Sequence, residues 1–274
     1  MSKVFRNQPH NWNFVDQGGG NFQATNQITG QILSGLPSAI AQTISQLQTS
    51  DKVVADCPQP YILSQTSVPV ILLSSATNIS ATGLITGLTA LPYQPAGVVQ
   101  VYCFARAGLA AGLYYARFSS TTSCQLYSDA AGSIALSGIT AGAYAGGTSE
   151  ATLSSVSVPG GSLGPNGSFR WSGVGLWPSN ANNKIMKVKF GGVTLPTVTR
   201  TTSTGDYWQF PFFNRGAQNL NTHPSSMMPA TGVTAIPRTI DTAVSQNFEF
   251  TAQLANAADF VILDAQSLEI LPGG

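Results

Sequence analysis

The sequence predicts a mainly β protein in which an N-terminal arm and a short helix precede two antiparallel, jelly-roll-like β-sandwich domains. From about Tyr61 onward, short runs of β-branched and aromatic residues are separated by Gly, Pro, Asn and Ser turn residues. A β-solenoid would require a repeating sequence period, and we find none. We therefore expect the arm and helix over residues 1–50, a first β domain over 51–145 and a C-terminal β domain over 146–274.

Charge is unusually scarce along the chain. Only 8% of the 274 residues are charged, against roughly a quarter in an average soluble protein, and the net charge is +1. No side chain between Asp56 and Arg106 carries a formal charge. This balance offers no electrostatic footprint for nucleic acid or an anionic membrane. Because little repulsion keeps copies of a charge-poor protein apart, we expect an oligomer.

The first 35 residues are expected to be an irregular arm. They combine the bulky residues Trp12, Phe14 and Phe22 with Asn, Gln and a run of three glycines at 18–20. Large apolar side chains on a flexible polar chain favour docking onto another surface. An N-terminal strand packed on the body of the same chain is an equal alternative. Residues 1–10 lack the apolar core of a signal peptide.

Residues 36–50 are predicted to form a helix. Pro37 suits the first turn, and Ile40, Ile44 and Leu47 recur at helical spacing opposite a face of Gln, Ser and Thr. A helix of about four turns is marginal alone and needs a partner for its apolar stripe. Three copies around a symmetry axis would supply one, as would the sheet of the same chain.

The first β region contains apolar runs at residues 68–73, 98–104 and 113–118. A weakly patterned stretch of Ala, Gly, Ser, Thr and Tyr at 129–150 is where we place the domain boundary. In the second region, residues 184–190 alternate so that Met186, Val188 and Phe190 face one way and two lysines the other. That alternation is typical of a sheet with one face in water.

Catalytic and metal-binding side chains are too few for a recognisable site. The two histidines, His10 and His223, occupy loop-like contexts, and neither completes a triad or a metal-ligand pair. The three cysteines, Cys57, Cys103 and Cys124, have no CxxC spacing and are interpreted as small buried hydrophobes in a protein made in a reducing cytosol. No glycine-rich phosphate loop is present, so we expect no enzyme, metal or cofactor.

Two features remain as candidates for a sugar site. Asp206 precedes Tyr207 and Trp208, but a glycosidase needs two carboxyls across a cleft, and Asp206 is better explained as a turn cap. The aromatic residues Trp171, Trp177 and those of the run 208–213 are expected to pack in a core or subunit interface. An exposed carbohydrate platform is the alternative for them.

The C-terminal half resembles a β-sandwich module of bacteriophage tail-fibre, head-fibre and decoration-type structural proteins. The resemblance covers residues 156–271. It rests on the runs VPGGSLGPNGSFR at 158–170, NNKIMKVKFGGVTL at 182–195, NRG at 214–216, QLANAAD at 253–259 and LEILP at 268–272. The run AAGLYYARFSSTT at 110–122 is also similar to an element of fibre proteins. These are turn and strand signatures, and they carry no catalytic residues.

The resemblance implies a virion protein made in the host cytoplasm. It implies a homotrimer with a distal β knob and an N-terminal anchor, which here would contain Trp12, Phe14 and Phe22. Its partners would be copies of itself, capsid or tail proteins, and potentially a host-surface glycan. Fibre, capsid decoration and carbohydrate-binding knob remain open at this point, as does a place on the head or the tail.

Overall fold

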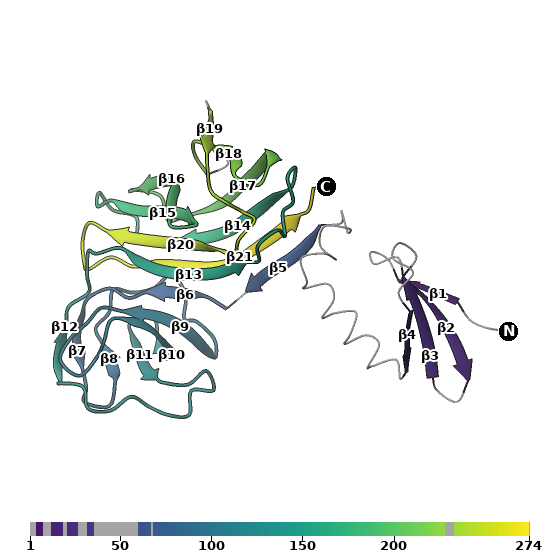
Figure 1. The fold of residues 1–274 in the computed structure, drawn as a ribbon. Helices are drawn as coiled ribbons and strands as arrows, with labels where there is room; N and C mark the ends of the chain where they lie inside the picture. The colour runs from purple at the N-terminus through teal and green to yellow at the C-terminus, as the bar shows by residue number, and fades with distance from the viewer. Residues whose placement is uncertain are drawn as a thin grey trace.

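A computed structural model describes residues 4–7, 12–18, 21–26, 32–35, 60–66, 68–227 and 233–273. All regular elements in these ranges are β-strands, as expected for a mainly β protein (Figure 1). The helix expected over residues 36–50, with Ile40, Ile44 and Leu47, lies outside the described residues. So do His10 and Cys57.

The N-terminal segment forms an antiparallel four-stranded sheet, so the expectation that it is irregular is wrong, while its role as an anchoring arm stays a prediction. The strands follow chain order: β1 (Val4–Asn7), β2 (Trp12–Gly18), β3 (Asn21–Asn26) and β4 (Ile32–Gly35). Trp12 and Phe14 lie in β2, and Phe22 lies in β3, opposite Asp16. Aromatic and β-branched residues favour strands, which accounts for these runs.

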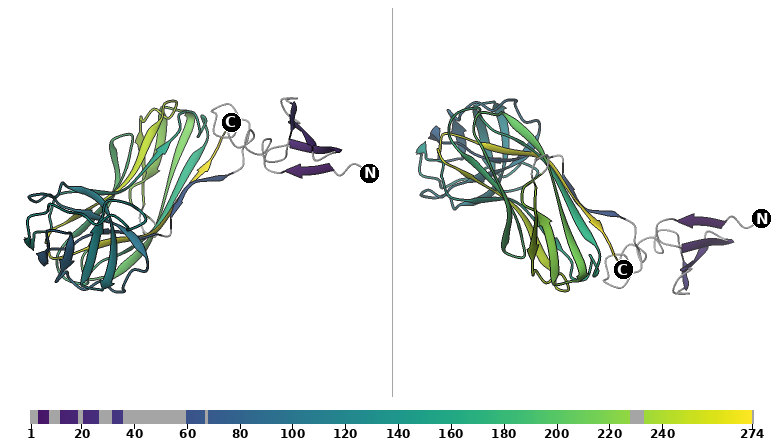
Figure 2. Two further views of the ribbon diagram at one scale, coloured as in Figure 1. Left: turned by 90° about the horizontal axis from the view of Figure 1, so that it is seen from below. Right: turned by 90° about the horizontal axis from the view of Figure 1, so that it is seen from above.

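The largest sheet has 13 strands and uses both halves of the chain. Its order is β12-β7-β8-β11-β10-β9-β6-β21-β14-β17-β18-β19, with β5 also paired to β21. From the first half come β5 (Tyr61–Thr66), β6 (Val70–Leu72), β7 (Ala76–Ile79), β8 (Leu84–Thr86), β9 (Val98–Cys103), β10 (Gly112–Ser120), β11 (Ser123–Tyr127) and β12 (Gly142–Tyr144). From the second half come β14 (Ser168–Leu176), β17 (Gly205–Ala217), β18 (Leu220–Pro224), β19 (Ala235–Arg238) and β21 (Val261–Leu271). Strands β14, β17 and β21 lie side by side in the views of Figure 2.

A third sheet contains four antiparallel strands in the order β13-β20-β15-β16. They are β13 (Ala151–Val158), β15 (Lys184–Phe190), β16 (Val193–Arg200) and β20 (Gln246–Leu254). The expected alternation in β15 is confirmed, since Met186, Val188 and Phe190 are fully buried. Lys187 and Lys189 are on the opposite face, where both form ion pairs with Glu150.

Two hydrophobic cores lie on opposite sides of strands β6 and β21. The first core contains Ile71 and Ile262 together with the buried residues of β7 to β11. The second core contains Leu72 and Leu263 and fills the space between the sheet β13-β20-β15-β16 and the large sheet. Successive residues of a strand point to opposite faces, so these two strands contribute to both cores. Strands that precede residue 145 and strands that follow it belong to the same large sheet. The division of the chain into two domains at that residue stays a prediction.

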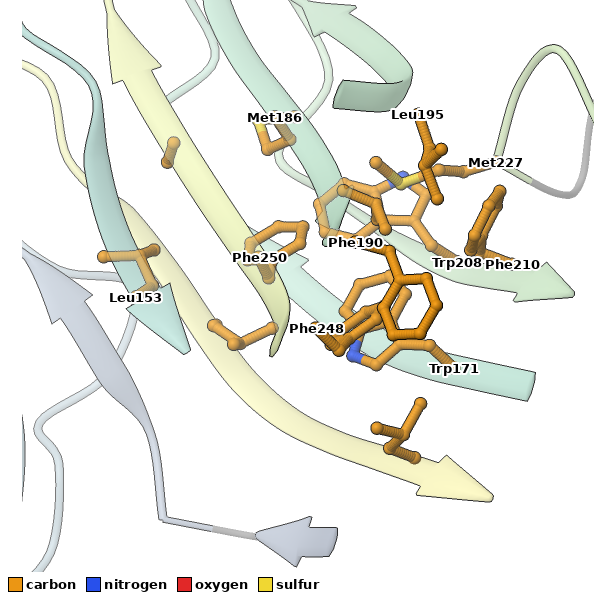
Figure 3. Packing of buried hydrophobic residues seen from close by; sticks show 14 of the residues in the cluster. Leu153, Trp171, Met186, Phe190, Leu195, Trp208, Phe210, Met227, Phe248 and Phe250 are labelled. Carbon is orange, nitrogen blue, oxygen red and sulfur yellow. The ribbon is translucent and has the colours of Figure 1, made fainter. Parts of the chain in front are cut away.

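The second core is rich in aromatic rings (Figure 3). Strand β14 leads into it with the alternate residues Trp171, Gly173, Gly175 and then Trp177 just beyond the strand. A Cβ atom on Gly173 would lie 2.5 Å from the Trp171 indole, and one on Gly175 would lie 2.4 Å from the Trp208 indole. The glycines therefore leave the space that the large rings occupy.

Candidate functional site

Most of the aromatic residues singled out in the sequence are core residues, and Phe213, at 43% exposure, is the exception. Trp171, Trp177, Trp208, Phe210 and Phe212 are at most 2% exposed. The Trp177 and Trp208 rings stack with centroids 5.4 Å apart, and Trp171 stacks on Phe250 at 5.0 Å. The expected core packing is confirmed for these rings, and none of them offers an exposed platform to a sugar.

His223 was expected to be a solvated loop residue, and this expectation is wrong. It lies in β18 with 1% exposure, and its ring centroid is 5.6 Å from that of Phe210. Nδ1 is 2.7 Å from the Pro224 carbonyl oxygen. Burial lowers the pKa of His223 below its ordinary value. In the part of the chain that the structure describes, no three His, Cys, Asp or Glu side chains gather as metal ligands.

The cysteines that the structure describes are buried, as expected. Cys103 and Cys124 are both inaccessible, and burial raises the pKa of the Cys103 thiol to about 12. A thiol that stays protonated near neutral pH is a poor nucleophile and metal ligand. Their role in the first core is packing.

Asp206 has a structural role at the start of β17. Its Oδ2 accepts hydrogen bonds from Arg200, with Nη2 at 2.5 Å and Nε at 3.0 Å. Its Oδ1 accepts a bond from the Tyr207 backbone N–H at 3.0 Å. Asp206 thus ties the ends of β16 and β17 across the turn between them.

A buried amide network holds the loops at one end of the second core. Asn214 Nδ2 donates to the Gly164 carbonyl at 2.6 Å and to Thr242 Oγ1 at 2.8 Å. Asn214 Oδ1 accepts a bond from Asn221 at 2.7 Å. The neighbouring residue Arg215 is exposed. Asn214, and not the exposed Arg215, therefore holds these loops together through its side-chain amide.

An uncharged groove crosses the outer face of the large sheet, away from the second core. Cross-strand pairing places Gln65, Ser267, Ser172 and Gln209 in one row over β5, β21, β14 and β17. The adjacent row contains Ala265, Val174 and Tyr207. These rows belong to a hollow of about 270 Å³, the outer groove, lined by Gln65, Thr66, Ser172, Gly173, Val174, Tyr207, Ala265, Gln266 and Ser267.

Tyr207 gives the outer groove an aromatic wall. The residue is 48% exposed, and Gln209 Nε2 donates a hydrogen bond of 2.8 Å to its hydroxyl. Hydroxyl and carboxamide groups both donate and accept hydrogen bonds, and an exposed ring offers a flat apolar surface. None of the lining residues carries a formal charge, and they supply no carboxyl pair for glycoside hydrolysis. The outer groove therefore offers hydrogen-bonding groups and one aromatic surface, without formal charge.

The outer groove was not predicted from the sequence. Its residues come from four strands that are far apart along the chain, and most of them are ordinary outward-facing residues, although Gly173 and Gln266 alternate toward the core. The one usable signal was Tyr207, which directly precedes the buried Trp208 in β17 and therefore alternates to the outer face. Trp12, Phe14 and Phe22, which were expected to anchor the chain, lie in strands of the N-terminal sheet and do not line the groove.

Comparisons with known proteins assign no family. No family model matches the chain, and no curated protein matches it. Among solved structures, winged bean acidic lectin in complex with methyl-α-D-galactose is similar at 8% identity and a TM-score of 0.26, over 78% of this chain and 98% of the lectin. The insecticidal δ-endotoxin Cry8Ea1 of Bacillus thuringiensis has 8% identity and a TM-score of 0.26, over 100% of this chain and 52% of the toxin.

Latent PorU of Porphyromonas gingivalis has 10% identity and a TM-score of 0.26, over 79% of this chain and 24% of that protein. TM-scores this low give no basis for transferring a function. Among the described residues, no helix is long and apolar enough to cross a membrane.

Proposed function

We propose that this chain is a non-enzymatic structural protein of a bacteriophage virion. In this proposal it is a trimeric fibre or knob whose N-terminal segment, with Trp12, Phe14 and Phe22, anchors it to the particle. The helix with Ile40, Ile44 and Leu47 contributes to the trimer axis. The β body, with jelly-roll-like sandwich domains, projects outward from the particle.

The proposal rests on the expectation, drawn from the sequence runs in residues 156–271, that this segment resembles phage virion modules. The absence of formal charge between Asp56 and Arg106 adds support, because these residues include β5 to β9. Ile62 and Val68 in this region are 58% and 48% exposed. Contacts between copies would bury such neutral surface without the cost of desolvating charges.

Light scattering on the purified full chain tests the oligomeric state. The proposal expects a mass three times that of one chain, and a monomer would count against it. Replacing Ile40, Ile44 and Leu47 together by Ser should convert the trimer to smaller species if the helix forms the axis. A trimer that survives this change would remove the helix from the interface.

Virions provide the test of location. A cryo-EM map of the intact particle should contain the β body attached through its N-terminal end. A high copy number over the capsid surface would replace the fibre assignment by decoration. Absence from purified particles would refute the virion role.

A carbohydrate-binding knob is a second candidate, favoured by the outer groove. Tyr207 and the polar row supply the aromatic surface and the hydrogen-bonding groups that a neutral glycan requires. Binding in the groove is compatible with the structural role, because the groove is formed within a single chain.

A further inference from the structure

Three reactive side chains meet at one end of the four-stranded sheet β13-β20-β15-β16. Lys184 is the first residue of β15, Asn180 lies in the preceding loop, and Asp259 lies in the connection from β20 to β21. Lys184 is 0% exposed and Asp259 is 3% exposed. By alternation, Lys184 shares the inward face of Met186, and no other lysine among the described residues is buried in this way.

The contacts among the three side chains are specific. Lys184 Nζ donates a hydrogen bond to Asn180 Oδ1, and Asn180 Nδ2 donates one of 2.7 Å to Asp259 Oδ1. Asp259 Oδ2 lies 3.6 Å from Lys184 Nζ. A single carboxyl therefore lies beside both the amine and the amide nitrogen, while the amine lies beside the amide carbonyl.

This arrangement contains the parts needed for an amide-forming reaction. An amine is the nucleophile, the side-chain amide of Asn180 is the acyl donor, and the Asp259 carboxyl can move protons between the two nitrogens. As a simple ion pair the arrangement is poor, because Asp259 Oδ2 has no hydrogen-bond partner among the described residues. Buried ion pairs with incomplete hydrogen bonding do not recover their desolvation cost.

We propose that Lys184 and Asn180 condense into an intramolecular isopeptide bond, with Asp259 as the acid–base group. Asp259 first takes a proton from the Lys184 ammonium, and the neutral Nζ attacks Cγ of Asn180. Asp259 then protonates Nδ2 and takes a second proton from Nζ. The Nζ–Cγ bond forms, the Cγ–Nδ2 bond breaks, and ammonia leaves.

The product removes both buried charges. Of the three ammonium protons, one remains on the new amide, one remains on Asp259 and one leaves with ammonia. A neutral amide and a neutral carboxyl are less costly in an interior than an ammonium and a carboxylate. The cross-link also fixes the 180–184 loop to β15. This inference does not depend on a virion role.

Condensation of Lys184 with Asp259 is the competing reaction, and it would release water. It lacks an acid–base group, because Asp259 is the only carboxyl among the described residues that pairs with Lys184 or Asn180. Asp206, the carboxyl of the neighbouring turn, is paired with Arg200. The geometry therefore favours the Asn180 product.

Mass spectrometry of the purified full chain tests the proposal. We expect an intact mass about 17 Da below that of the sequence, from the loss of ammonia. Trypsin should leave Lys184 uncleaved and yield a peptide of residues 171–187 that carries the same deficit, with a link between Asn180 and Lys184. A full-mass chain, or a peptide cut normally after Lys184, would overturn the proposal.

Two other modifications are distinguished by the same peptide map. A succinimide at Asn166 or at Asn180 also loses ammonia, but it leaves Lys184 open to trypsin. A deficit of about 18 Da with Lys184 linked to Asp259 would mean loss of water and would overturn the assignment to Asn180.

Variants assign the roles. Asp259→Asn should restore the full mass and trypsin cleavage after Lys184, because it keeps the size of the side chain but removes the proton carrier. Lys187→Gln is the matched control, since Lys187 lies on the same strand and pairs with Glu150 on the opposite face. It should keep the deficit, and a peptide of residues 171–189 should carry it. A deficit that persists in Asp259→Asn would refute the role of Asp259.

Discussion

Ile71 of β6 lies opposite Ile262 of β21, and both side chains are buried in the first core. Their neighbours Leu72 and Leu263 point the other way, into the second core. These two strands come from opposite ends of the described body. The hydrogen-bonded pairing of β6 with β21 therefore supplies side chains to both cores.

Ile71→Ala should destabilise the protein by about 2–5 kcal/mol, because it leaves a cavity in a fully buried site. Urea unfolding followed by tryptophan fluorescence measures this, since Trp171, Trp177 and Trp208 are all in the second core. A lower urea midpoint of the tryptophan transition would mean that a cavity in the first core also destabilises the second core. An unchanged tryptophan transition would show that the cores unfold independently.

Ile62→Ala is the matched control for this change. Ile62 is 58% exposed on β5, so removal of its side chain should alter stability by no more than about 0.5 kcal/mol.

Gly175→Ala should cost about 1–3 kcal/mol, because the added methyl group would lie 2.4 Å from the Trp208 ring. The near-ultraviolet circular dichroism should change as the stacked rings move. Ser172→Ala on the outer face of the same strand is the control and should leave the spectrum unaltered. If Gly175→Ala keeps both wild-type stability and spectrum, the glycine is not needed for ring packing.

Tyr207→Ala should weaken binding of neutral glycans by about tenfold or more, equivalent to roughly 1.4 kcal/mol. The aromatic wall of the outer groove is lost, while the core residues of β17 are unchanged. Binding is measured on an array of neutral and acidic glycans with the wild-type chain and the variant side by side.

Phe213→Ala is the control, because Phe213 is 43% exposed on the same strand but does not line the groove. Equal binding by wild type and Tyr207→Ala, or no binding of any neutral glycan, would refute the groove as a sugar site.

Glu150 should make stability depend on pH in the acid range. Burial alone raises the pKa of this carboxyl, but hydrogen bonds and charge from Lys187 and Lys189 outweigh burial and lower the pKa to about 2. The unfolded value is about 4.3, so the stabilisation is complete well above that pH and is lost as the pH falls toward 2.

Glu150→Gln should cost about 1 kcal/mol at pH 7 and make little difference at pH 2, measured by the urea midpoint. Glu269→Gln, at the ion pair with the half-exposed Arg170, is the control and should change stability by no more than about 0.5 kcal/mol at pH 7. A Glu150→Gln chain as stable as wild type at pH 7 would remove the ion pairs as a source of stability.

The sequence by itself determined the β class and which faces of the best-patterned strands are buried. Alternation in residues 184–190 placed Met186, Val188 and Phe190 correctly, since a strand directs successive side chains to opposite faces. The same rule also applied to Lys184, whose inward parity was visible in the sequence. A lysine at an inward position was the signal for the Lys184–Asn180–Asp259 cluster, and it was missed.

Local composition was misleading in two segments that resemble loops but form strands. His223 lies in a stretch rich in Ser, Met and Pro that is typical of a loop, yet pairing with neighbouring strands buries it beside Phe210. The Gly- and Asn-rich N-terminal segment contains short strands that pair with each other. The N-terminal pairings join strands that are neighbours in the chain, and composition alone concealed them. Burial of His223 depends on its packing against Phe210 in the folded sheet, which composition does not reveal.

Only the tertiary structure decided how the two halves of the chain are joined. Residues 70–72 and 261–263 pair although almost the whole described body separates them along the chain. Neither segment contains a sequence feature that predicts this pairing. Backbone hydrogen bonds are the same for every sequence, so strand order depends on which apolar faces fit together in the folded protein. The outer groove and the Lys184 cluster are consequences of that order.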